Sequence, residues 1–290
     1  SEVIISIQSI KSNRLLEITD KFLKQNVKVK IVPPLSKWIQ GDLQANQIKQ
    51  INIDDLLGRD QISINNPIVK KEVTGKVVFV TGAAGSIGSE LCRQALAHGA
   101  ATLLLLERNE YGLYSIEQEL RAKLGAHQVL VPLLGSVGNR KRVEQIFQAY
   151  RVDTVYHAAA YKHVPLVEGS PSEGVVNNVF GTQILAEAAE AHGVGRFVLI
   201  STDKAVRPTN VMGASKRLAE MLLQSMQQQG STTLFTMVRF GNVLGSSGSV
   251  VPLFRRQIAE GGPVTVTHPD ITRFFMTIPE AVELVIQAGA

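Results

Sequence analysis

Apolar and polar positions follow two different periods from Lys76 to the end of the chain. Short apolar, β-branched runs, expected to be strands, alternate with longer runs in which apolar residues recur every three or four positions, as on a helix face. The expected strands lie near 76–81, 101–106, 128–133, 153–157, 196–200 and 234–240, and the expected helices near 86–98, 110–124, 139–149, 172–192, 212–229, 249–260 and 279–288. This alternation predicts an α/β fold: a parallel sheet with helices on both faces.

The first 74 residues carry a smaller pattern of the same kind. It contains a strand, a helix, a second strand and a proline pair that ends it, at Val3–Ile7, Lys11–Lys24, Val27–Val32 and Pro33–Pro34. A further segment, 51–64, leads into a linker around 65–74. We therefore predict a small N-terminal α/β segment with its linker over 1–74 and a larger domain over 75–290. No glycine-rich turn precedes the first helix, so we expect no cofactor in the N-terminal segment.

Composition limits the classes of protein to which the chain can belong. An apolar share of 44% is enough for a full core, and a single cysteine, Cys92, excludes an internal disulfide. No run of 18 apolar residues occurs, so we expect no membrane span within these residues. The net charge of +5 is not gathered in a basic cluster interleaved with aromatics, and we expect no nucleic-acid partner. The chain starts in a strand pattern and stops just after a helical one, so we expect a piece of a longer protein.

A glycine-rich turn follows the first strand of the larger domain. The strand leads into T-G-A-A-G-S-I-G-S-E, where a helical pattern begins. Glycines at this place allow a tight turn and let the backbone approach a pyrophosphate, and the helix N-terminus supplies free N–H groups. Strand, turn and helix together predict a Rossmann-like, doubly wound domain that binds a dinucleotide. The cofactor-binding candidates here are Gly82, Gly85, Ser86, Ile87 and Gly88.

The residues after the second strand of this domain bear on which dinucleotide is bound. Glu107 ends that strand, 19 residues after Gly88. A carboxylate there accepts hydrogen bonds from the adenosine ribose and repels a 2′-phosphate, which favours NAD over NADP. Arg108 follows directly, and its guanidinium could instead pair with a 2′-phosphate, so NADP remains the alternative.

A second group of polar residues follows the strand Phe197 to Ile200. Asp203 and Lys204 are neighbours in a loop at the strand end, and Lys216 follows Met212 by four residues on an expected helix. Residues four apart share a helix face, and many nucleotide-dependent oxidoreductases have a tyrosine four residues before such a lysine. A methionine thioether carries no proton, so proton transfer must fall to other residues. An adjacent carboxylate and amine can supply one acid and one base.

These residues resemble the extended short-chain dehydrogenase/reductase proteins that act on nucleotide sugars. The glycine turn, the segment H-A-A-A-Y-K-H-V-P, the helix start N-N-V-F-G-T and the lysine four residues after position 212 carry the resemblance, which covers about 76–290. Within that group the chain is similar to the large, membrane-anchored UDP-N-acetylglucosamine 4,6-dehydratases, through T-D-K-A-V-R-P-T-N-V-M-G-A-S-K, F-G-N-V-L-G-S-S-G-S-V-V-P-L-F and H-P-D-I-T-R-F-F-M-T-I-P-E-A.

The resemblance implies a function and a setting. The function is NAD-dependent conversion of UDP-N-acetylglucosamine to a UDP-4-keto-6-deoxy-N-acetylhexosamine, for bacterial polysaccharide, capsule or glycan synthesis. In that family a membrane-spanning region precedes a truncated nucleotide-binding-like domain resembling the first 75 residues. The full-length protein is then expected at the cytoplasmic face of the bacterial inner membrane. Substrate-binding elements are expected from about residue 241 onward.

The resemblance also implies roles for single residues. Lys204 takes the proton from carbon 5 of the sugar, and Asp203 protonates the departing water. Lys216 holds the hydroxyls of the nicotinamide ribose, and Thr202 hydrogen-bonds the hydroxyl on carbon 4. Met212 departs from the wider group, which leaves the acceptor of the carbon 4 hydroxyl proton open among Asp203, Thr202 and water.

Further candidate residues concern adenine, the cofactor trough and the substrate. Ser136 stands where related proteins carry an aspartate for the adenine amino group, so we expect adenine recognition to rest on backbone groups near Val137. Small side chains are expected to line the cofactor trough at Ala158, Ala159 and Ala160. The substrate-binding candidates are Lys162, His163, Asn242 and Arg273, since arginine suits a diphosphate. No histidine pairs with another ligand at metal spacing, so we expect no metal.

The sequence leaves two alternative functions open and also predicts an assembly state. A sugar 4-epimerase shares the scaffold, but it needs redox chemistry only at carbon 4 and usually depends on the missing tyrosine. A non-catalytic dinucleotide-binding module is the third reading, against which the retained polar residues argue. Two long helices pair across a two-fold axis in related proteins, and 175–191 with 212–229 are the candidates here. We therefore expect at least a homodimer.

Overall fold

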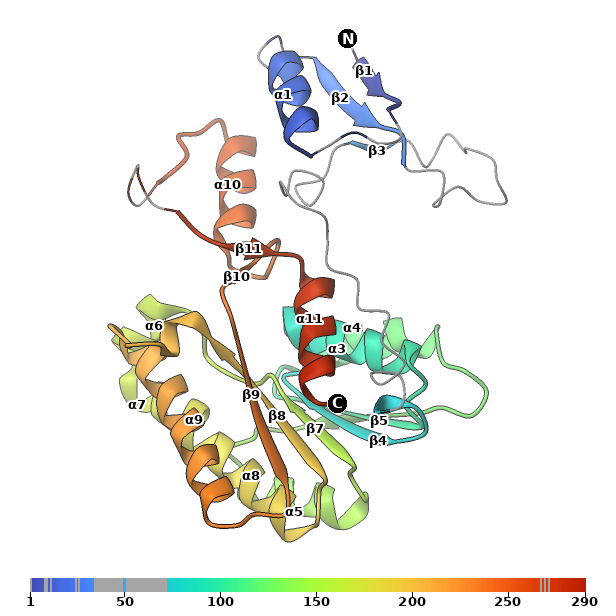
Figure 1. Cartoon of the computed structure of the whole chain (residues 1–290), viewed down its shortest axis with the longest axis vertical. Helices are drawn as coiled ribbons and strands as arrows, with labels where there is room; N and C mark the ends of the chain where they lie inside the picture. The colour runs from blue at the N-terminus through green and yellow to red at the C-terminus, as the bar shows by residue number, and fades with distance from the viewer. Residues whose placement is uncertain are drawn as a thin grey trace. The chain divides into compact units, whose positions relative to one another are not determined.

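The structure is a computed structural model that describes residues 2–7, 10, 12–23, 25, 27–33, 49–50, 72–266, 268, 270 and 272–290. The chain divides into two compact units (Figure 1): residues 1–62 with 275–277, and residues 63–274 with 278–290. The expected segment 51–64 and most of the linker at 65–74 lie outside the described residues. The boundary at residue 74 therefore stays a prediction.

The larger unit is built on a six-stranded sheet. Its strands are all parallel and lie in the order β6 (Val129–Leu134), β5 (Thr102–Glu107), β4 (Val77–Thr81), β7 (Thr154–His157), β8 (Arg196–Thr202) and β9 (Leu234–Phe240). The strand order reverses direction between β4 and β7, which is the switch point of a doubly wound fold. The predicted Rossmann-like fold class is confirmed.

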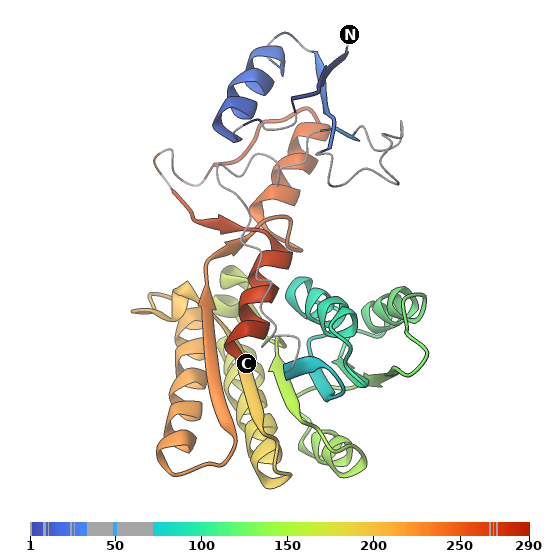
Figure 2. The same cartoon turned by 45° about the vertical axis from the view of Figure 1, so that its right-hand side comes forward.

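Helices cover both faces of this sheet, as Figures 1 and 2 show. One face carries α3 (Ser86–Ala97), α4 (Glu110–Arg121) and α11 (Ile278–Ala288), and the other carries α5 (Arg140–Ala149), α8 (Gly181–Ala191) and α9 (Val211–Gln228). Alternate residues of one strand belong to different cores: Val78 and Val80 pack on one side, Phe79 on the other. Burial on both faces explains why the strands have continuous apolar sequences. Cys92 is fully buried in α3, as its small apolar character indicated.

The expected helix at 172–192 is not continuous. It consists of α7 (Pro171–Val175), a π-helical turn η4 (Val176–Phe180) and α8. The π turn holds Asn178 in the interior, where its amide bonds the backbone of Tyr161. A single π turn inside a longer helix has no residue-type signature of its own, so the sequence pattern did not reveal it. The pattern also missed α6 (Val164–Gly169) and the 3₁₀ turn η5 (Asp203–Ala205).

Three short elements follow β9 along the chain before α11. They are β10 (Asn242–Val243), α10 (Val250–Ala259) and β11 (Phe275–Met276). Among the described residues, no helix combines the length and the apolar character needed to cross a bilayer.

The N-terminal unit contains β1 (Glu2–Ile5), α1 (Ser12–Leu23), β2 (Lys28–Ile31) and β3 (Lys49–Gln50). Strands β1 and β2 are parallel, as expected for a β-α-β piece, and β3 pairs antiparallel to β2. Its small core centres on Ile5, Leu15 and Val29. The antiparallel strand was not predicted from the sequence.

Candidate functional site

A cavity of about 800 Å³ lies at the carboxyl ends of the central strands. It brings together predicted cofactor, catalytic and substrate residues: Gly85, Ser86, Ile87, Gly88, Ala158, Ala160, Lys162, His163, Thr202, Lys204, Met212, Lys216 and Asn242. The remaining candidates, all described by the structure, are not among its lining residues: Gly82, Glu107, Arg108, Ser136, Val137, Ala159, Asp203 and Arg273. Residues that the sequence places more than 150 positions apart therefore share one cavity.

The glycine turn forms one wall of the cavity through its backbone. Gly82 has a φ of +66°, which favours glycine, and a Cβ there would lie 2.7 Å from the nitrogen of Ala159. A Cβ on Gly88 would overlap the carbonyl oxygen of Gly82, so helix α3 packs directly on the turn. No side chain caps α3, and the N–H groups of its first turn are available to an anion in the cavity.

Glu107 joins this turn to strand β5. Its carboxylate is buried and accepts from the N–H groups of Arg108 and Asn109, at 2.9 Å each, and of Ala84 at 3.2 Å. A negative charge is thereby fixed beside the glycine turn, where the sequence predicted contact with a ribose. Arg108 is exposed; its guanidinium donates to the Tyr161 hydroxyl and lies over the Tyr161 ring.

The residues expected around adenine have mainly local contacts. The Ser136 hydroxyl accepts from the N–H of Gly138 at 3.2 Å, and Val137 is buried. A Cβ on Gly181 would lie 2.8 Å from the Val137 side chain, so Val137 packs on the start of α8. The adenine role of Ser136 and Val137 stays a prediction.

The acid and the amine of the catalytic stretch lie on η5, just after β8. Lys204 Nζ lies 3.0 Å from Asp203 Oδ1, and the Thr202 hydroxyl donates to the same oxygen at 3.0 Å. Burial would raise the pKa of Asp203, but the ion pair with Lys204 and the Thr202 hydrogen bond hold that pKa below its ordinary value. Asp203 is therefore a carboxylate, with the Lys204 ammonium as its counter-ion. Lys204 lines the cavity, whereas Asp203 stands beside it.

Met212 and Lys216 are buried on the first turns of α9 and both line the cavity, as their spacing predicted. Burial lowers the pKa of Lys216 to about 8, and the negative charge of Glu220 opposes the shift. A Cβ on Gly213 would overlap the carbonyl oxygen of Lys204. The start of α9 is thus packed against η5, which fixes Asp203 and Lys204 relative to Lys216.

A buried hydrogen-bond network that the sequence analysis did not predict supports these residues. His157, at the end of β7, has Nδ1 at 2.7 Å from the Thr81 hydroxyl and Nε2 at 2.9 Å from the Thr182 hydroxyl. Thr182 donates its proton to the carbonyl of Asn178, so His157 Nε2 must donate and Nδ1 must accept from Thr81. Burial, with the nearby Lys216 charge, lowers the pKa of His157 to about 3 and keeps the ring neutral.

Asn178 extends this network to helix α9. Its amide donates to the Tyr161 carbonyl and to the Ser215 hydroxyl, both at 3.0 Å, and Ser215 donates to the Met212 carbonyl at 2.7 Å. The network therefore runs from strand β4 to the helix that carries Lys216. Both H-A-A-A and N-N-V-F-G-T were visible in the sequence, but no spacing rule predicts that these segments meet.

The substrate candidates divide into two groups. Lys162, His163 and Asn242 line the cavity; burial lowers the pKa of Lys162, and His163 packs on Gly248 in the loop before α10. The same loop approaches the glycine turn, because the Ser247 N–H donates to the Ser86 hydroxyl at 3.0 Å. Arg273 is exposed and donates to the carbonyl of Thr272 at 2.8 Å. The structure therefore does not bring Arg273 into the lining of this cavity.

Comparison with known proteins shows which proteins the chain is similar to. A model of the family described as "Polysaccharide biosynthesis protein" matches residues 78–290. The chain is 48% identical over 289 residues to "Capsular polysaccharide biosynthesis protein CapD" of Staphylococcus aureus, covering 100% of this chain and 48% of that protein. It is 47% identical over 288 residues to "Probable polysaccharide biosynthesis protein EpsC" of Bacillus subtilis, covering 99% and 48%. The chain thus spans about half the length of these curated relatives.

Other relatives match about three quarters of the chain. A "UDP-glucose 4-epimerase" of Rickettsia canadensis is 36% identical over 219 residues, 73% of this chain and 62% of that protein. The X-ray structure of Pen from Bacillus thuringiensis superposes with a TM-score of 0.69 at 38% identity, covering 74% of this chain and 66% of that one. A DesIV double mutant, a dTDP-glucose 4,6-dehydratase from Streptomyces venezuelae solved with NAD bound, gives 0.64 at 23% identity over 72% and 70%. That last likeness shows the shared fold.

Proposed function

The chain belongs to the polysaccharide biosynthesis protein family whose model it matches, and on that basis we propose that it catalyses the NAD-dependent 4,6-dehydration of UDP-N-acetylglucosamine. The product is a UDP-4-keto-6-deoxy-N-acetylhexosamine for polysaccharide, capsule or protein-glycan synthesis. One observation carries the proposal: the paired Asp203 and Lys204 stand at the cavity that also holds Met212 and Lys216. An acid and a base are required for elimination of water, and no tyrosine occupies position 212.

The cofactor half of the cavity fits NAD. The uncapped N-terminus of α3 offers N–H groups to a pyrophosphate, and Oε2 of the Glu107 carboxylate, which accepts only from Ala84 among the described residues, retains a lone pair for a ribose hydroxyl. The chemistry that NAD supplies when bound is removal of a hydride from carbon 4 of the sugar and its return at carbon 6. Lys216, at the other end of the cavity, would hold the nicotinamide ribose and place positive charge near carbon 4.

The catalytic pair shares one proton, and its position defines two states. In the ion pair Lys204 is an ammonium and cannot accept a proton. Transfer of that proton to Asp203 gives a neutral amine and a carboxylic acid, which are the base and the acid that elimination needs. Lys204 then takes the proton from carbon 5, and Asp203 gives its proton to the hydroxyl leaving carbon 6. The pair returns to its ion-paired state, so protons balance over one elimination.

Thr202 is placed to assist the first step. Its hydroxyl lines the cavity end of β8 and donates to Asp203 Oδ1 at 3.0 Å. A hydroxyl in this position can accept a hydrogen bond from the carbon 4 hydroxyl and pass that proton to water, because Asp203 takes its proton from Lys204. Water then gives a proton back to carbon 5 when the hydride returns to carbon 6, so protons balance over the whole cycle. Met212 offers shape at this wall and no proton.

A sugar 4-epimerase is the second candidate. It is favoured by the 36% identity to a protein named as a UDP-glucose 4-epimerase. Epimerisation needs only the redox step at carbon 4 and has no use for the second acid–base group that Asp203 and Lys204 form together. The dehydratase uses every polar residue of the catalytic half, which is why we favour it. A non-catalytic module would use none of them.

We further propose that the protein works as a homo-oligomer and that its full-length form is anchored at the cytoplasmic face of a bacterial membrane. The helix faces expected to pair expose apolar side chains: Val176, Phe180, Leu218 and Met221 are each about half exposed. The membrane anchor rests on the family resemblance and on the chain's spanning about half of its relatives.

The test is conversion of UDP-N-acetylglucosamine, followed by mass spectrometry in this chain and in the full-length protein. Loss of one water is the expected result, and Lys204→Ala serves as the matched inactive control. A product of unchanged mass with inverted configuration at carbon 4 would assign the epimerase. Tightly bound NAD without any conversion of UDP-sugars would assign the non-catalytic module.

A further inference from the structure

A second, smaller cavity adjoins the turn that carries the catalytic pair. It has a volume of about 540 Å³ and is lined by residues after η5, on α9 and on β9: Ala205, Val206, Arg207, Pro208, Arg217, Gln224 and Arg239. It shares no lining residue with the larger cavity. We propose that this second cavity binds a small phosphate-bearing anion.

The first reason is its charge. Three of the seven lining residues are arginines, and none is acidic. Glu220, which is fully buried behind them, accepts from Arg217 at 3.1 Å and from Arg239 at 2.8 Å through Nε. Glu220 thus pairs with two of the three guanidinium groups, and the described residues that form the cavity carry two positive charges more than negative ones. Planar guanidinium groups that are held in place suit the oxygens of a phosphate.

The second reason is that two of the arginines are held rigidly and still reach solvent. Glu220 also accepts from the Ser201 hydroxyl at 2.5 Å, so its carboxylate is fixed from three sides. The Arg217 and Arg239 side chains are nevertheless 36% and 38% exposed. Each guanidinium thus has a buried edge bonded to Glu220 and further N–H donors available to a ligand.

Arg207 completes the site. It has no hydrogen-bond or ion-pair partner among the described residues, and it is exposed. Its φ of +48° is the only positive value for a non-glycine residue in the described part of the chain. That backbone conformation is uncommon for an L-residue, and the following Pro208 restricts it further. The fold therefore keeps Arg207 at the cavity in a backbone conformation that arginine rarely adopts.

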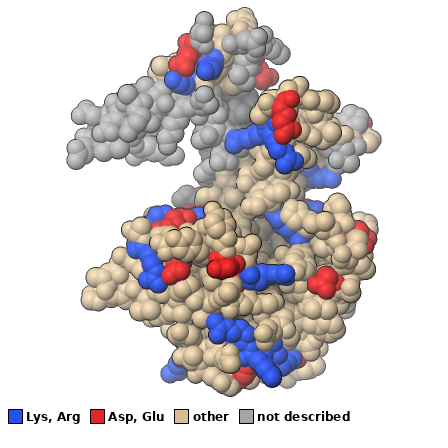
Figure 3. Space-filling view, turned by 180° about the vertical axis from the view of Figure 1, so that it is seen from behind, with Lys and Arg blue, Asp and Glu red and all other residues tan. Residues whose placement is uncertain are grey.

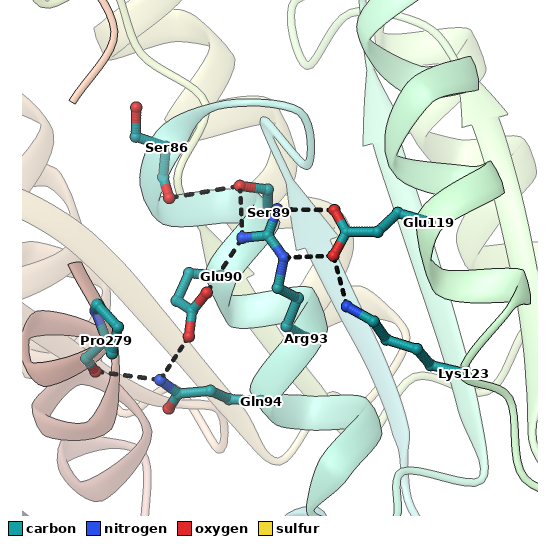
Figure 4. Close-up of polar contacts among 8 residues, drawn as sticks. All are labelled: Ser86, Ser89, Glu90, Arg93, Gln94, Glu119, Lys123 and Pro279. Carbon is teal, nitrogen blue, oxygen red and sulfur yellow. Dashed lines mark hydrogen bonds and ion pairs between the residues drawn. The ribbon is translucent and has the colours of Figure 1, made fainter. Parts of the chain in front are cut away.

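The charged cluster around Arg93 shows a different arrangement, in which every charge is paired (Figure 4). Arg93 binds Glu119 through two nitrogens, at 2.7 and 2.8 Å, and Glu90 through a third at 3.0 Å, and Lys123 binds Glu119 at 2.7 Å. Two cations meet two carboxylates there, so no charge is left over. By contrast, the cluster of Arg207, Arg217 and Arg239 has more positive than negative charge among the described residues that form it.

The position of the site gives it a route to the catalytic pair. Ala205, which lines the second cavity, is the last residue of η5, the turn that begins with Asp203 and Lys204. Glu220 connects the arginines to Ser201, the residue before Thr202. An anion bound at the arginines is therefore in contact with the segment that carries the chemistry, without entering the substrate cavity.

Binding of inorganic diphosphate to the chain, measured by isothermal titration calorimetry at constant ionic strength, tests the site. In the chain saturated with NAD, whose pyrophosphate would occupy the glycine turn, we expect one diphosphate per chain. Arg207→Gln should weaken its binding roughly 10–100-fold, the worth of a lost charge-assisted contact. Gln224→Glu should weaken it as well, because it adds a negative charge to the lining at an exposed position. Arg93→Gln and Gln118→Glu make the same charge changes elsewhere and should leave binding unaltered.

Uridine diphosphate, titrated in parallel, distinguishes a free phosphate ligand from one carried by a nucleotide. Tighter binding of either probe supports the site, provided that Arg207→Gln weakens that binding. Binding that withstands Arg207→Gln and Gln224→Glu but is lost in Lys204→Ala would place the anion in the larger cavity and overturn the proposal. Binding that disappears when sodium chloride raises the ionic strength would also overturn the proposal, since such binding is unspecific charge attraction that salt screens.

Discussion

The two halves of the large cavity are built in different ways. In the cofactor half the backbone forms the wall: Gly82 and Gly88 pack so closely that neither position has room for a Cβ. In the catalytic half side chains form the wall, and a buried network from Thr81 through His157 and Asn178 holds them in place. The cofactor half therefore depends on close packing of the backbone, and the catalytic half on the polar groups of its side chains.

This difference predicts how each half responds to substitution. A substitution in the cofactor half should abolish NAD binding and turnover together, because an added side chain would displace the closely packed backbone. A change in the catalytic half should remove turnover while NAD stays bound. The variants below separate the two behaviours, beginning with the largest expected effect.

Gly88→Ala should cause the most damage. The new methyl group would overlap the carbonyl oxygen of Gly82, so helix α3 would have to move away from the turn. We expect loss of bound NAD, measured by extraction and chromatography of the purified protein, together with loss of turnover. Gly169→Ala is the matched control, because a Cβ there meets no atom within 4 Å. A Gly88→Ala variant that retains NAD would show that the turn is more adaptable than its packing indicates.

Lys204→Ala and Asp203→Asn should reduce turnover by about 10²–10⁴-fold, the usual worth of general acid–base catalysis. Both residues lie outside the glycine turn, so bound NAD should be unchanged. In deuterated solvent, Lys204→Ala should also stop deuterium from entering carbon 5 of the sugar, as followed by mass spectrometry. Near-normal turnover in either variant would move the chemistry to other groups.

Lys216→Met should alter the pH dependence of stability. The pKa of Lys216 is about 8 in the folded chain and near 10.5 when the residue is exposed. Between these values the unfolded chain binds more protons than the folded one, so the free energy of unfolding rises with pH there. The destabilisation is fully present below pH 8 and disappears as the pH approaches 10.5.

The methionine variant has no charge to bury, so at pH 7 its free energy of unfolding should exceed that of the wild type by about 3 kcal/mol. Denaturant titrations at several pH values between 7 and 10.5 measure this, and the difference between the two proteins should shrink as the pH rises. A constant difference across the range would show that Lys216 is not the titrating group. We also expect the same variant to lose turnover. Lys216 would then be a residue that function requires although its burial lowers the stability of the fold.

Met212→Ala should have the smallest effect on turnover. The thioether carries no proton, so we expect a loss within about tenfold, well below the general acid–base range. Met212→Tyr need not improve the rate, because the ring would fill space at the cavity wall that substrate or water can use. Steady-state kinetics on UDP-N-acetylglucosamine measure both. If Met212→Ala is as damaging as Asp203→Asn, the assignment of the catalytic pair is wrong.

The sequence was sufficient for features that depend on local patterns. The six strands and the helices between them follow from apolar periods, and the position of the glycine turn follows from the backbone's need for residues without a Cβ. The shared face of Met212 and Lys216 follows from helix geometry alone. These features need only neighbouring residues, which is why a single sequence predicts them.

Only the tertiary structure decided which polar groups meet. The neutral ring of His157 between two threonines and the bonds from Ser201 and Arg239 to Glu220 all join residues of different elements. The same holds for Arg273, which the motif placed among substrate residues and the fold leaves outside the cavity lining. A sequence states which donors and acceptors exist; their partners, burial and charge balance depend on distances that the packing of the whole domain sets.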